Sequence, residues 1–202
     1  MMCKQKIEDL RQLFKRYDFV MKTSELSLEK IYYADIQNFL GTGLIEKVKR
    51  GYYQWIYEYA DSDVVLLKKL FPDAVFCMET ACFYYWYSDR TPSQWNFAID
   101  RRVSKNRTNI DYPFLKVYRT EQKLLTLGMT KYTIDGIEVN MYDRDRTVCD
   151  CLRYMDQMDK EIFNKVIQNY VKDPKKNIPN LIKYAKVLRV TKKARDWIEV
   201  WM

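Results

Sequence analysis

The chain has 202 residues, of which 48% are hydrophobic and 15% aromatic, so it can fill a real core and is not expected to be disordered. It contains no histidine, which excludes hydrolases with a Ser-His-Asp triad and metal sites built on imidazole. Its formal net charge of +8 favours a partner that carries phosphates or carboxylates.

The first 60 residues carry the pattern of a winged helix-turn-helix. Apolar residues recur at helical spacing in three consecutive segments, and Thr23 is placed to cap the second of them. In this arrangement the third segment is the recognition helix. The expected helices cover residues 4–17, 23–28 and 31–40.

The segment after the third helix predicts the wing. Gly41 and Gly43 provide the permissive backbone that ends a helix. Two strand-like runs follow, and a short turn with Arg50 and Gly51 joins them. A cationic hairpin beside a short helix is suited to DNA binding. The two strands are expected over residues 44–49 and 52–57.

Polar side chains on these elements are the candidate DNA contacts. Gln37 and Asn38 can each present a donor and an acceptor to a base edge, and Tyr33 lies one turn earlier on the helix. The wing cations should contact phosphates and set the register of the protein on DNA. The alternative is that these residues only solvate a small helical domain. The predicted phosphate contacts are Lys47, Lys49 and Arg50, with Lys22 and Lys30 nearby.

A second domain is expected over residues 61–202. The polar cluster Asp61-Ser62-Asp63 is placed to begin a helix that ends before Pro72, so the boundary is drawn between residues 60 and 61. Strands and helices are mixed beyond it, which predicts an α+β fold that ends in helices. Strands are expected over 74–76, 95–99, 114–119, 129–134 and 137–142, the last two joined at Asp135-Gly136, with helices over 64–71 and 79–87 and mainly helices from Arg146, broken at Asp173-Pro174 and near Ile178-Pro179.

The run Phe83-Tyr84-Tyr85-Trp86-Tyr87 admits two interpretations. Most of its rings are expected in the core, but five consecutive aromatics cover every face of a helix, so one or two must lie near the surface. Exposed rings beside cations can stack on the bases of single-stranded RNA. The cations that follow are Arg90, Arg101, Arg102, Lys105 and Arg107, for which a solvated loop is the alternative.

The block from Arg146 to Asp150 also admits two interpretations. Asp145 or Thr147 could cap a helix there, and Arg146 and Asp150 have the i, i+4 spacing of an ion pair. These residues would then be architectural. In the functional interpretation, Arg146 or Asp150 contacts another protein or an RNA. The residues expected to face inward are Val148, Cys149 and Leu152.

The C-terminal segment is the most basic part of the chain, since residues 174–202 hold eight Lys or Arg against two Asp or Glu. The cations recur every three or four residues, which predicts one charged helix face. Such a face attracts phosphates or an acidic partner, or is only a solvated surface. The charged face comprises Lys183, Lys186, Arg189, Lys192 and Lys193, and the apolar face comprises Leu181, Tyr184, Val187 and Leu188.

Cysteine usage and hydropathy predict a cytoplasmic protein without a metal site. The five cysteines are odd in number and form no C-x-x-C pair, so reduced, buried thiols are expected. No apolar run reaches the roughly 18 residues that a membrane span needs. The first 15 residues do not resemble a signal peptide.

Three blocks form a pattern in chain order. The first is the wing, with the core Val48-Lys49-Arg50-Gly51-Tyr52-Tyr53. The second runs from Phe71-Pro72-Asp73-Ala74-Val75-Phe76 to Tyr87, and Pro92 and a strand follow it. The third and most distinctive is Tyr142-Asp143-Arg144-Asp145-Arg146-Thr147-Val148-Cys149-Asp150-Cys151-Leu152-Arg153. Over residues 20–155 the chain resembles the AbiEi family of bacterial antitoxins, from the AbiE type IV toxin-antitoxin and abortive phage infection systems.

The resemblance implies a winged helix followed by a mixed α/β antitoxin domain with a helical, basic C-terminus. Such proteins repress their own operon by binding repeats in its promoter, and they oppose a nucleotidyltransferase-like toxin encoded next door without a stable complex. No enzymatic activity, cofactor or metal is implied. The candidate residues for antitoxin function are Arg146, Asp150, Lys183, Lys186 and Arg189.

Two other functions remain as alternatives. One is a stand-alone winged-helix regulator without a toxin partner. The other is a kinase-like or nucleotidyltransfer enzyme in which Asp143, Asp145 and Asp150 hold a metal ion. The sequence has no Gly-rich phosphate loop to support the enzyme.

Overall fold

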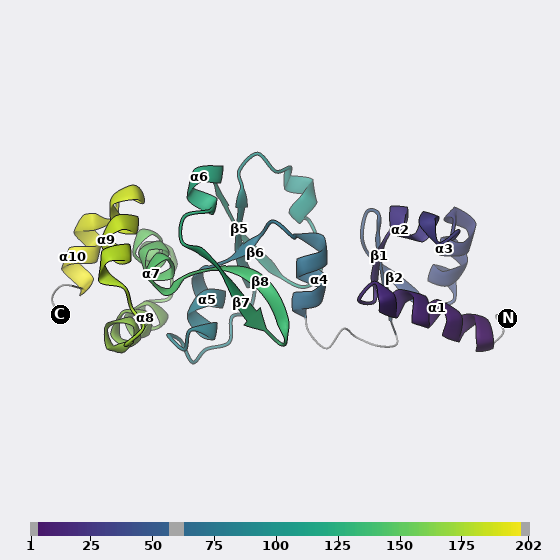
Figure 1. The fold of residues 1–202 in the computed structure, drawn as a ribbon, viewed down its shortest axis with the longest axis horizontal. Coiled ribbons are helices and arrows are strands. Elements are labelled where there is room, and N and C mark those ends of the chain that lie inside the picture. The colour runs from purple at the N-terminus through teal and green to yellow at the C-terminus, as the bar shows by residue number, and fades with distance from the viewer. Residues whose placement is uncertain (1–3, 57–62, 199–202) are drawn as a thin grey trace. The chain divides into compact units, whose positions relative to one another are not determined.

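The structure is a computed structural model that describes residues 4–56 and 63–198 (Figure 1). The chain divides into two compact units: residues 1–72 with 109–113 form the first, and residues 73–108 with 114–202 form the second. Both contain helices and strands, so the fold is α+β. The boundary expected between residues 60 and 61, and Asp61 and Ser62 of the cap cluster, lie outside the described residues.

The first unit has an element order compatible with a winged helix. Its three strands form an antiparallel sheet in the order β1-β3-β2, and the predicted hairpin is β2 and β3. The three predicted helices are confirmed to within two residues at each end. Its elements are α1 (Lys4–Arg16), β1 (Val20–Lys22), α2 (Thr23–Leu28), α3 (Tyr33–Gly41), β2 (Ile45–Lys49), β3 (Tyr52–Trp55) and α4 (Asp63–Leu70).

A carboxylate in the first turn of α2, and another in the first turn of α3, accepts a hydrogen bond from the cap amide of its helix. The Lys22 amide donates to Glu25 Oε2 at 2.7 Å, and the Tyr32 amide donates to Asp35 Oδ2 at 3.0 Å. The predicted cap at Thr23 is wrong, because the pairing of β1 with β3 keeps Lys22 extended and Thr23 becomes the first helical residue. A third-position carboxylate that binds the cap amide is one half of a capping box.

The core of the first unit is apolar and closely packed. Phe14 from α1 and Trp55 from β3 are 0% and 2% exposed, and their ring centroids lie 5.7 Å apart. Leu26, Ile36 and Ile45 join them from α2, α3 and β2. Each such side chain contributes about 1.5–3 kcal/mol on burial, so this core fixes α3 and the hairpin on one scaffold.

The second unit is built around a five-stranded mixed sheet in the order β6-β5-β4-β8-β7. β4 is parallel to β8 and β5 is parallel to β6, whereas the other two pairs are antiparallel. Its strands are β4 (Val75–Phe76), β5 (Trp95–Asp100), β6 (Leu115–Thr120), β7 (Met129–Ile134) and β8 (Ile137–Tyr142).

Helices of the second unit gather around α7, which contacts α5, α8, α9 and α10. Figure 1 shows α7 to α10 as one group beyond the sheet. Among the described residues, no helix is long and apolar enough to cross a membrane. The helices are α5 (Met78–Tyr84), α6 (Gln122–Leu125), α7 (Arg144–Arg153), α8 (Lys160–Lys172), α9 (Ile178–Val187) and α10 (Thr191–Ile198), with 3₁₀ turns at Lys105–Thr108 and Met155–Gln157.

Two predicted helices of this unit differ from the structure. The helix expected over 79–87 ends at Tyr84, because Trp86 takes a left-handed backbone with φ +63°. The C-terminal cations do not share one helix, because α9 ends at Val187 and Arg189, with φ +60°, lies before α10. The predicted breaks at Asp173-Pro174 and Ile178-Pro179 are confirmed, as α8 ends before the first and α9 begins at the second.

Candidate nucleic-acid interface

The solvent face of α3 carries the predicted base-contacting residues. Ile36 and Phe39 are 2% and 9% exposed and anchor the helix to the core. Tyr33 is 76% exposed, and Gln37 and Asn38 are also exposed. All three polar candidates therefore point to solvent, as a helical period of 3.6 residues requires.

Two small residues complete this face, and sequence reasoning missed them because they carry no polar side-chain group. Ala34, Gln37, Asn38 and Gly41 follow the i, i+3, i+4, i+7 pattern, and all four are exposed. A Cβ added at Gly41 would meet nothing within 4 Å. The small residues at both ends of the stripe leave its two amide side chains sterically accessible.

The hairpin presents two kinds of cation. Lys47 and Arg50 are exposed, and neither forms an ion pair with another described residue. Lys49 is half-buried, with its Nζ 4.6 Å from the centroid of the Tyr52 ring. The Nζ of Lys22 on β1 lies 5.8 Å from the same ring. Because Lys22 and Lys49 both pair in register with Tyr52, the three side chains form a row across the sheet.

This row bears on the prediction that Lys49 contacts a DNA phosphate. A cation near an aromatic ring gains about 0.5–1 kcal/mol, so the half-buried Tyr52 ring restrains Lys22 and Lys49, and the Lys49 Nζ also lies 4.6 Å from the centroid of the Phe71 ring. Lys47 and Arg50 have no such ring contact within the described residues and are exposed on the hairpin. The remaining predicted cation, Lys30, is exposed in the turn between α2 and α3.

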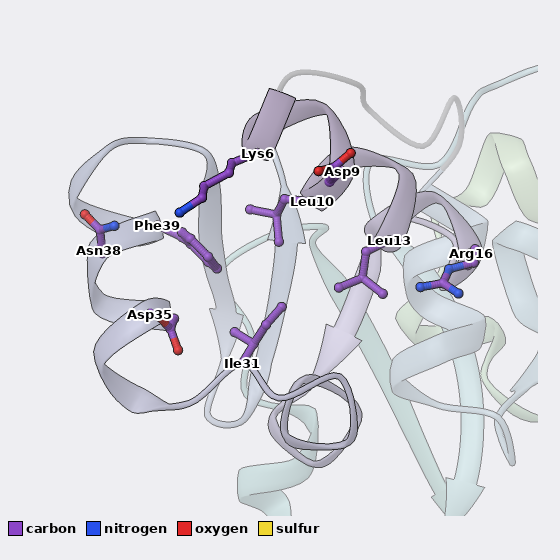
Figure 2. A pocket seen from close by; sticks show the side chains of 9 residues that line it. All are labelled: Lys6, Asp9, Leu10, Leu13, Arg16, Ile31, Asp35, Asn38 and Phe39. Atoms are coloured by element: carbon purple, nitrogen blue, oxygen red, sulfur yellow. The ribbon is translucent and has the colours of Figure 1, made fainter. Parts of the chain in front are cut away.

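A groove of about 440 Å³ lies beside α3, between α1 and α3 (Figure 2). Leu10, Leu13 and Phe39 form its apolar floor. Its rim carries charges of both signs, so it has no marked preference for an anion or a cation. The rim residues are Lys6, Asp9, Arg16, Asp35 and Asn38.

In the second unit, the block that begins at Asp143 ties α7 to its neighbours. The Asp143 carboxylate accepts from the Arg146 amide at 2.7 Å and from the Tyr184 hydroxyl at 2.9 Å. Asp143 is thus the cap of α7, and the predicted caps Asp145 and Thr147 are wrong because the helix already begins at Arg144.

Arg144 and Asp145 connect the same helix to α8 and α9. The Arg144 Nε donates to Asp173 Oδ2 at 2.8 Å. The Asp145 Oδ1 accepts from the Tyr170 hydroxyl at 2.7 Å and from the Asn177 amide at 2.8 Å. Burial raises the pKa of Asp145, and these two donors oppose that shift.

Arg146 and Asp150 form the predicted ion pair, and it is buried. The Arg146 Nε lies 3.1 Å from Asp150 Oδ2, and the two side chains are 2% and 6% exposed. The Arg146 Nη1 donates to the carbonyls of Leu124 and Leu127, both at 2.7 Å, and the guanidinium lies 4.1 Å from the Tyr142 ring centroid. Neither residue is placed to contact a partner directly.

The electrostatics of the pair follow from this burial. Burial raises the pKa of Asp150, and the neighbouring Arg146 opposes that effect. Burial also disfavours the charged form of Arg146, but the Asp150 carboxylate, together with Tyr142 and Cys77, outweighs burial and raises the pKa of Arg146. The three carboxylates of the metal-ion alternative, Asp143, Asp145 and Asp150, all accept hydrogen bonds from the chain itself.

The other candidate antitoxin residues are on the surface. Lys183, Lys186 and Arg189 are exposed, whereas Leu181, Tyr184 and Leu188 are buried as predicted. Val187, expected on the apolar face, is instead 48% exposed, because it lies at the last turn of α9.

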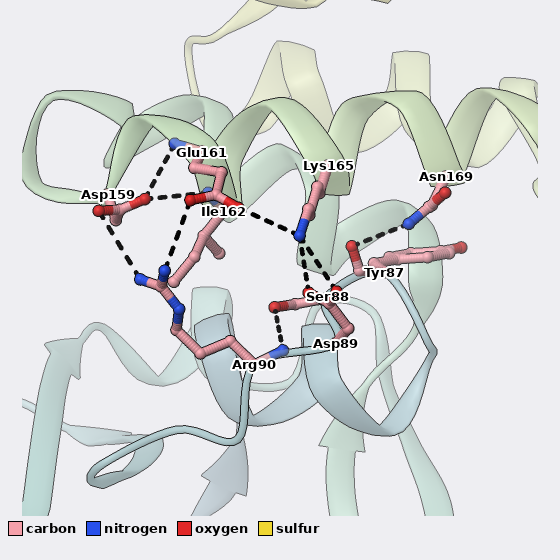
Figure 3. Close-up of polar contacts among 9 residues, drawn as sticks. All are labelled: Tyr87, Ser88, Asp89, Arg90, Asp159, Glu161, Ile162, Lys165 and Asn169. Atoms are coloured by element: carbon pink, nitrogen blue, oxygen red, sulfur yellow. Dashed lines mark hydrogen bonds and ion pairs between the residues drawn. The ribbon is translucent and has the colours of Figure 1, made fainter.

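The aromatic run divides between core and surface. Tyr85 and Tyr87 are buried, whereas Trp86 is 83% exposed. Ion pairs hold the following loop against α8, as Figure 3 shows: Asp89 pairs with Lys165 at 3.0 Å, and Arg90 pairs with Glu161 at 3.5 Å. The exposed Trp86 ring therefore lies next to a loop that ion pairs fix to α8.

Most cations of the adjoining basic loop are paired within the protein. Arg102 donates to the Asp100 carboxylate at 2.8 Å, and Arg101 lies 3.1 Å from Glu121. Arg107 is paired with Asp73. These contacts favour the solvated loop over an RNA contact at this position.

No family model matches the chain, and the search of curated proteins found no match to its sequence.

Proposed function

We propose that the chain binds promoter DNA through its winged helix and represses its own operon. The observation that carries this proposal is the exposed stripe Ala34, Gln37, Asn38 and Gly41 on α3, next to a hairpin with two cations that form no ion pair within the described part of the chain. α3 would enter the major groove, where amide side chains read base edges. The hairpin would contact the phosphates and position the helix.

The test is a titration of full-length protein with two DNA duplexes, one from the promoter upstream of its gene and one of random sequence, at two salt concentrations. Arg50→Ala should weaken binding to both duplexes and reduce the salt slope by about 1. Gln37→Ala should cost about 1–3 kcal/mol on the promoter duplex only. Lys172→Ala, in the second unit, is the matched control. Equal losses on both duplexes for both variants would refute this division of roles.

We further propose that the protein is the antitoxin of a type IV toxin-antitoxin, or abortive phage infection, system and opposes a nucleotidyltransferase-like toxin without a stable complex. The support is the resemblance of three sequence blocks to AbiEi antitoxins. The third block includes α7, the helix that contacts α5, α8, α9 and α10 in the second unit. The protein would have no catalytic role of its own.

Growth of cells that express the neighbouring gene tests this second proposal. Arg50→Ala should still restore growth but no longer repress a promoter reporter. A triple variant with Glu at Lys183, Lys186 and Arg189 should remain folded and lose protection. The matched control places Glu at the exposed residues Lys160, Lys172 and Lys175. If the neighbouring gene is harmless, the protein is a stand-alone winged-helix regulator and the antitoxin assignment fails.

A further inference from the structure

A second groove, of about 520 Å³, lies in the second unit, away from the elements of the winged helix. Three separate elements supply cations to it: Lys123 lies on α6, Arg153 at the end of α7, and Arg189 between α9 and α10. Sequence reasoning selected only Arg189. The other two are missed because they lie 66 and 36 residues away in the chain, and only the fold brings them together.

The charge of the groove is strongly one-sided. Its only carboxylate among the described residues is Glu121, which lies 3.3 Å from Lys123 and 3.1 Å from Arg101. Arg153 and Arg189 are exposed and have no carboxylate partner in the described chain. Two arginines therefore face a common space in which Glu121 is the only carboxylate of the described residues, and Glu121 is already paired with Lys123 and Arg101.

The groove also has an apolar side. Leu124, Val187 and Leu188 line it, and Val187 is 48% exposed. Pockets for small organic ligands typically have about 300–1,000 Å³ and combine apolar walls with a few polar groups that fix orientation. The volume of this groove falls in that range, whereas its lining is more polar, because four of its seven residues are charged.

Arginine indicates which anion the groove would accept. A guanidinium binds phosphate or carboxylate through two parallel hydrogen bonds, and arginine predominates where such planar recognition matters. A phosphate monoester with two negative charges matches two arginines better than a single carboxylate does. We propose that this groove binds a phosphorylated ligand of nucleotide size, with its phosphates on Arg153 and Arg189 and its apolar part against Val187.

The competing explanation is that the arginines only complement the helix ends. Arg153 and Arg189 lie at the C-termini of α7 and α9, where a positive side chain offsets the negative end of the helix dipole. This explanation predicts an effect on stability without any ligand. Binding and thermal stability must therefore be measured on the same variants.

The experiment is isothermal titration of the full-length protein, at about 150 mM salt, with ATP, AMP, tripolyphosphate, adenosine and citrate. Titration with RNA that bears a 5′-phosphate or a 5′-hydroxyl distinguishes a free nucleotide from the phosphorylated end of a nucleic acid. The variants are Arg153→Gln, Arg189→Gln and the double variant. Lys172→Gln, at the exposed end of α8, is the matched control.

We expect one saturable site for the phosphorylated probes and none for adenosine. Each arginine variant should weaken binding by about tenfold, as for the loss of a hydrogen bond to a charged group, while Lys172→Gln remains within about twofold of wild type. Arg153→Lys keeps the charge but loses the two parallel N–H donors of the guanidinium, so its affinity should lie between those of wild type and Arg153→Gln.

Three results would overturn the proposal. The first is the absence of saturable binding of ATP and tripolyphosphate by the wild type. The second is an equal loss of affinity in Lys172→Gln, which would indicate unspecific attraction to a basic protein. The third is a lower melting temperature for the arginine variants with unchanged affinity, which would assign both side chains to the helix ends alone.

Discussion

Replacing Asp150 by alanine should strongly destabilise the second unit. The substitution removes the only carboxylate among the described residues that contacts the buried guanidinium of Arg146, which is 2% exposed. Loss of one partner of a buried ion pair costs about 3–5 kcal/mol. The carbonyls of Leu124 and Leu127 and the ring of Tyr142 still surround the cation, so a value near the lower end, about 3 kcal/mol, is expected.

Urea denaturation of the full-length chain, followed by tryptophan fluorescence and circular dichroism, measures this loss. The double variant Arg146→Met, Asp150→Leu replaces both charges by apolar groups and should recover much of the stability of Asp150→Ala, because paired removal of a buried ion pair is often close to neutral. A loss below about 1 kcal/mol in Asp150→Ala would refute the reasoning. So would a stable Asp150→Ala protein that no longer protects cells, since Asp150 would then act by contact.

Three further substitutions test other parts of the second unit. Gly128→Ala should be more destabilising than Gly136→Ala in urea denaturation. Both glycines have a positive φ, which costs a residue with a side chain about 1–3 kcal/mol. Only at Gly128 would the added Cβ also lie 2.6 Å from the Arg146 Cβ. The Arg102 guanidinium lowers the pKa of Asp100 from 3.8 to about 2. The ionised carboxylate therefore stabilises the fold fully above pH 3.8, and this contribution is lost as the pH falls toward 2. Asp100→Asn should flatten the dependence of the free energy of unfolding on pH over this range. Tyr87→Phe removes the hydroxyl that donates to Asp173 Oδ2 at 2.7 Å and should cost about 1 kcal/mol, whereas Trp86→Ala, on an exposed ring, should change the free energy of unfolding by less than about 0.5 kcal/mol.

Local sequence signals predict the elements that depend on local contacts. The hairpin of β7 and β8 has the predicted bounds, because strand-forming residues flank an Asp135-Gly136 turn that fixes the register. The exposed face of α3 follows from the helical period in the same way. Both features depend on contacts between residues close together in the chain, so a single sequence is enough to predict them.

Elements that depend on distant partners are not predictable in this way. β1 has only three residues and exists because it pairs with β3, about 30 residues later, so it has no pattern of its own. The contacts of Arg146 show the same difference. Its i, i+4 spacing predicts the contact with Asp150, whereas nothing in the sequence predicts that it donates to the carbonyls of Leu124 and Leu127. The row of Lys22, Tyr52 and Lys49 likewise requires the register of all three strands.

The placement of the Asp143–Asp150 block changes where recognition should be sought. Each charged side chain of this block is paired within the second unit: Asp143 with Tyr184, Arg144 with Asp173, Asp145 with Tyr170, and Arg146 with Asp150. A charge that satisfies a buried partner is not available to a ligand without the cost of breaking that contact. Substitutions in the block therefore report on folding, and exposed residues outside it, such as Arg153, Arg189 and Trp86, are the positions where substitutions can report on binding.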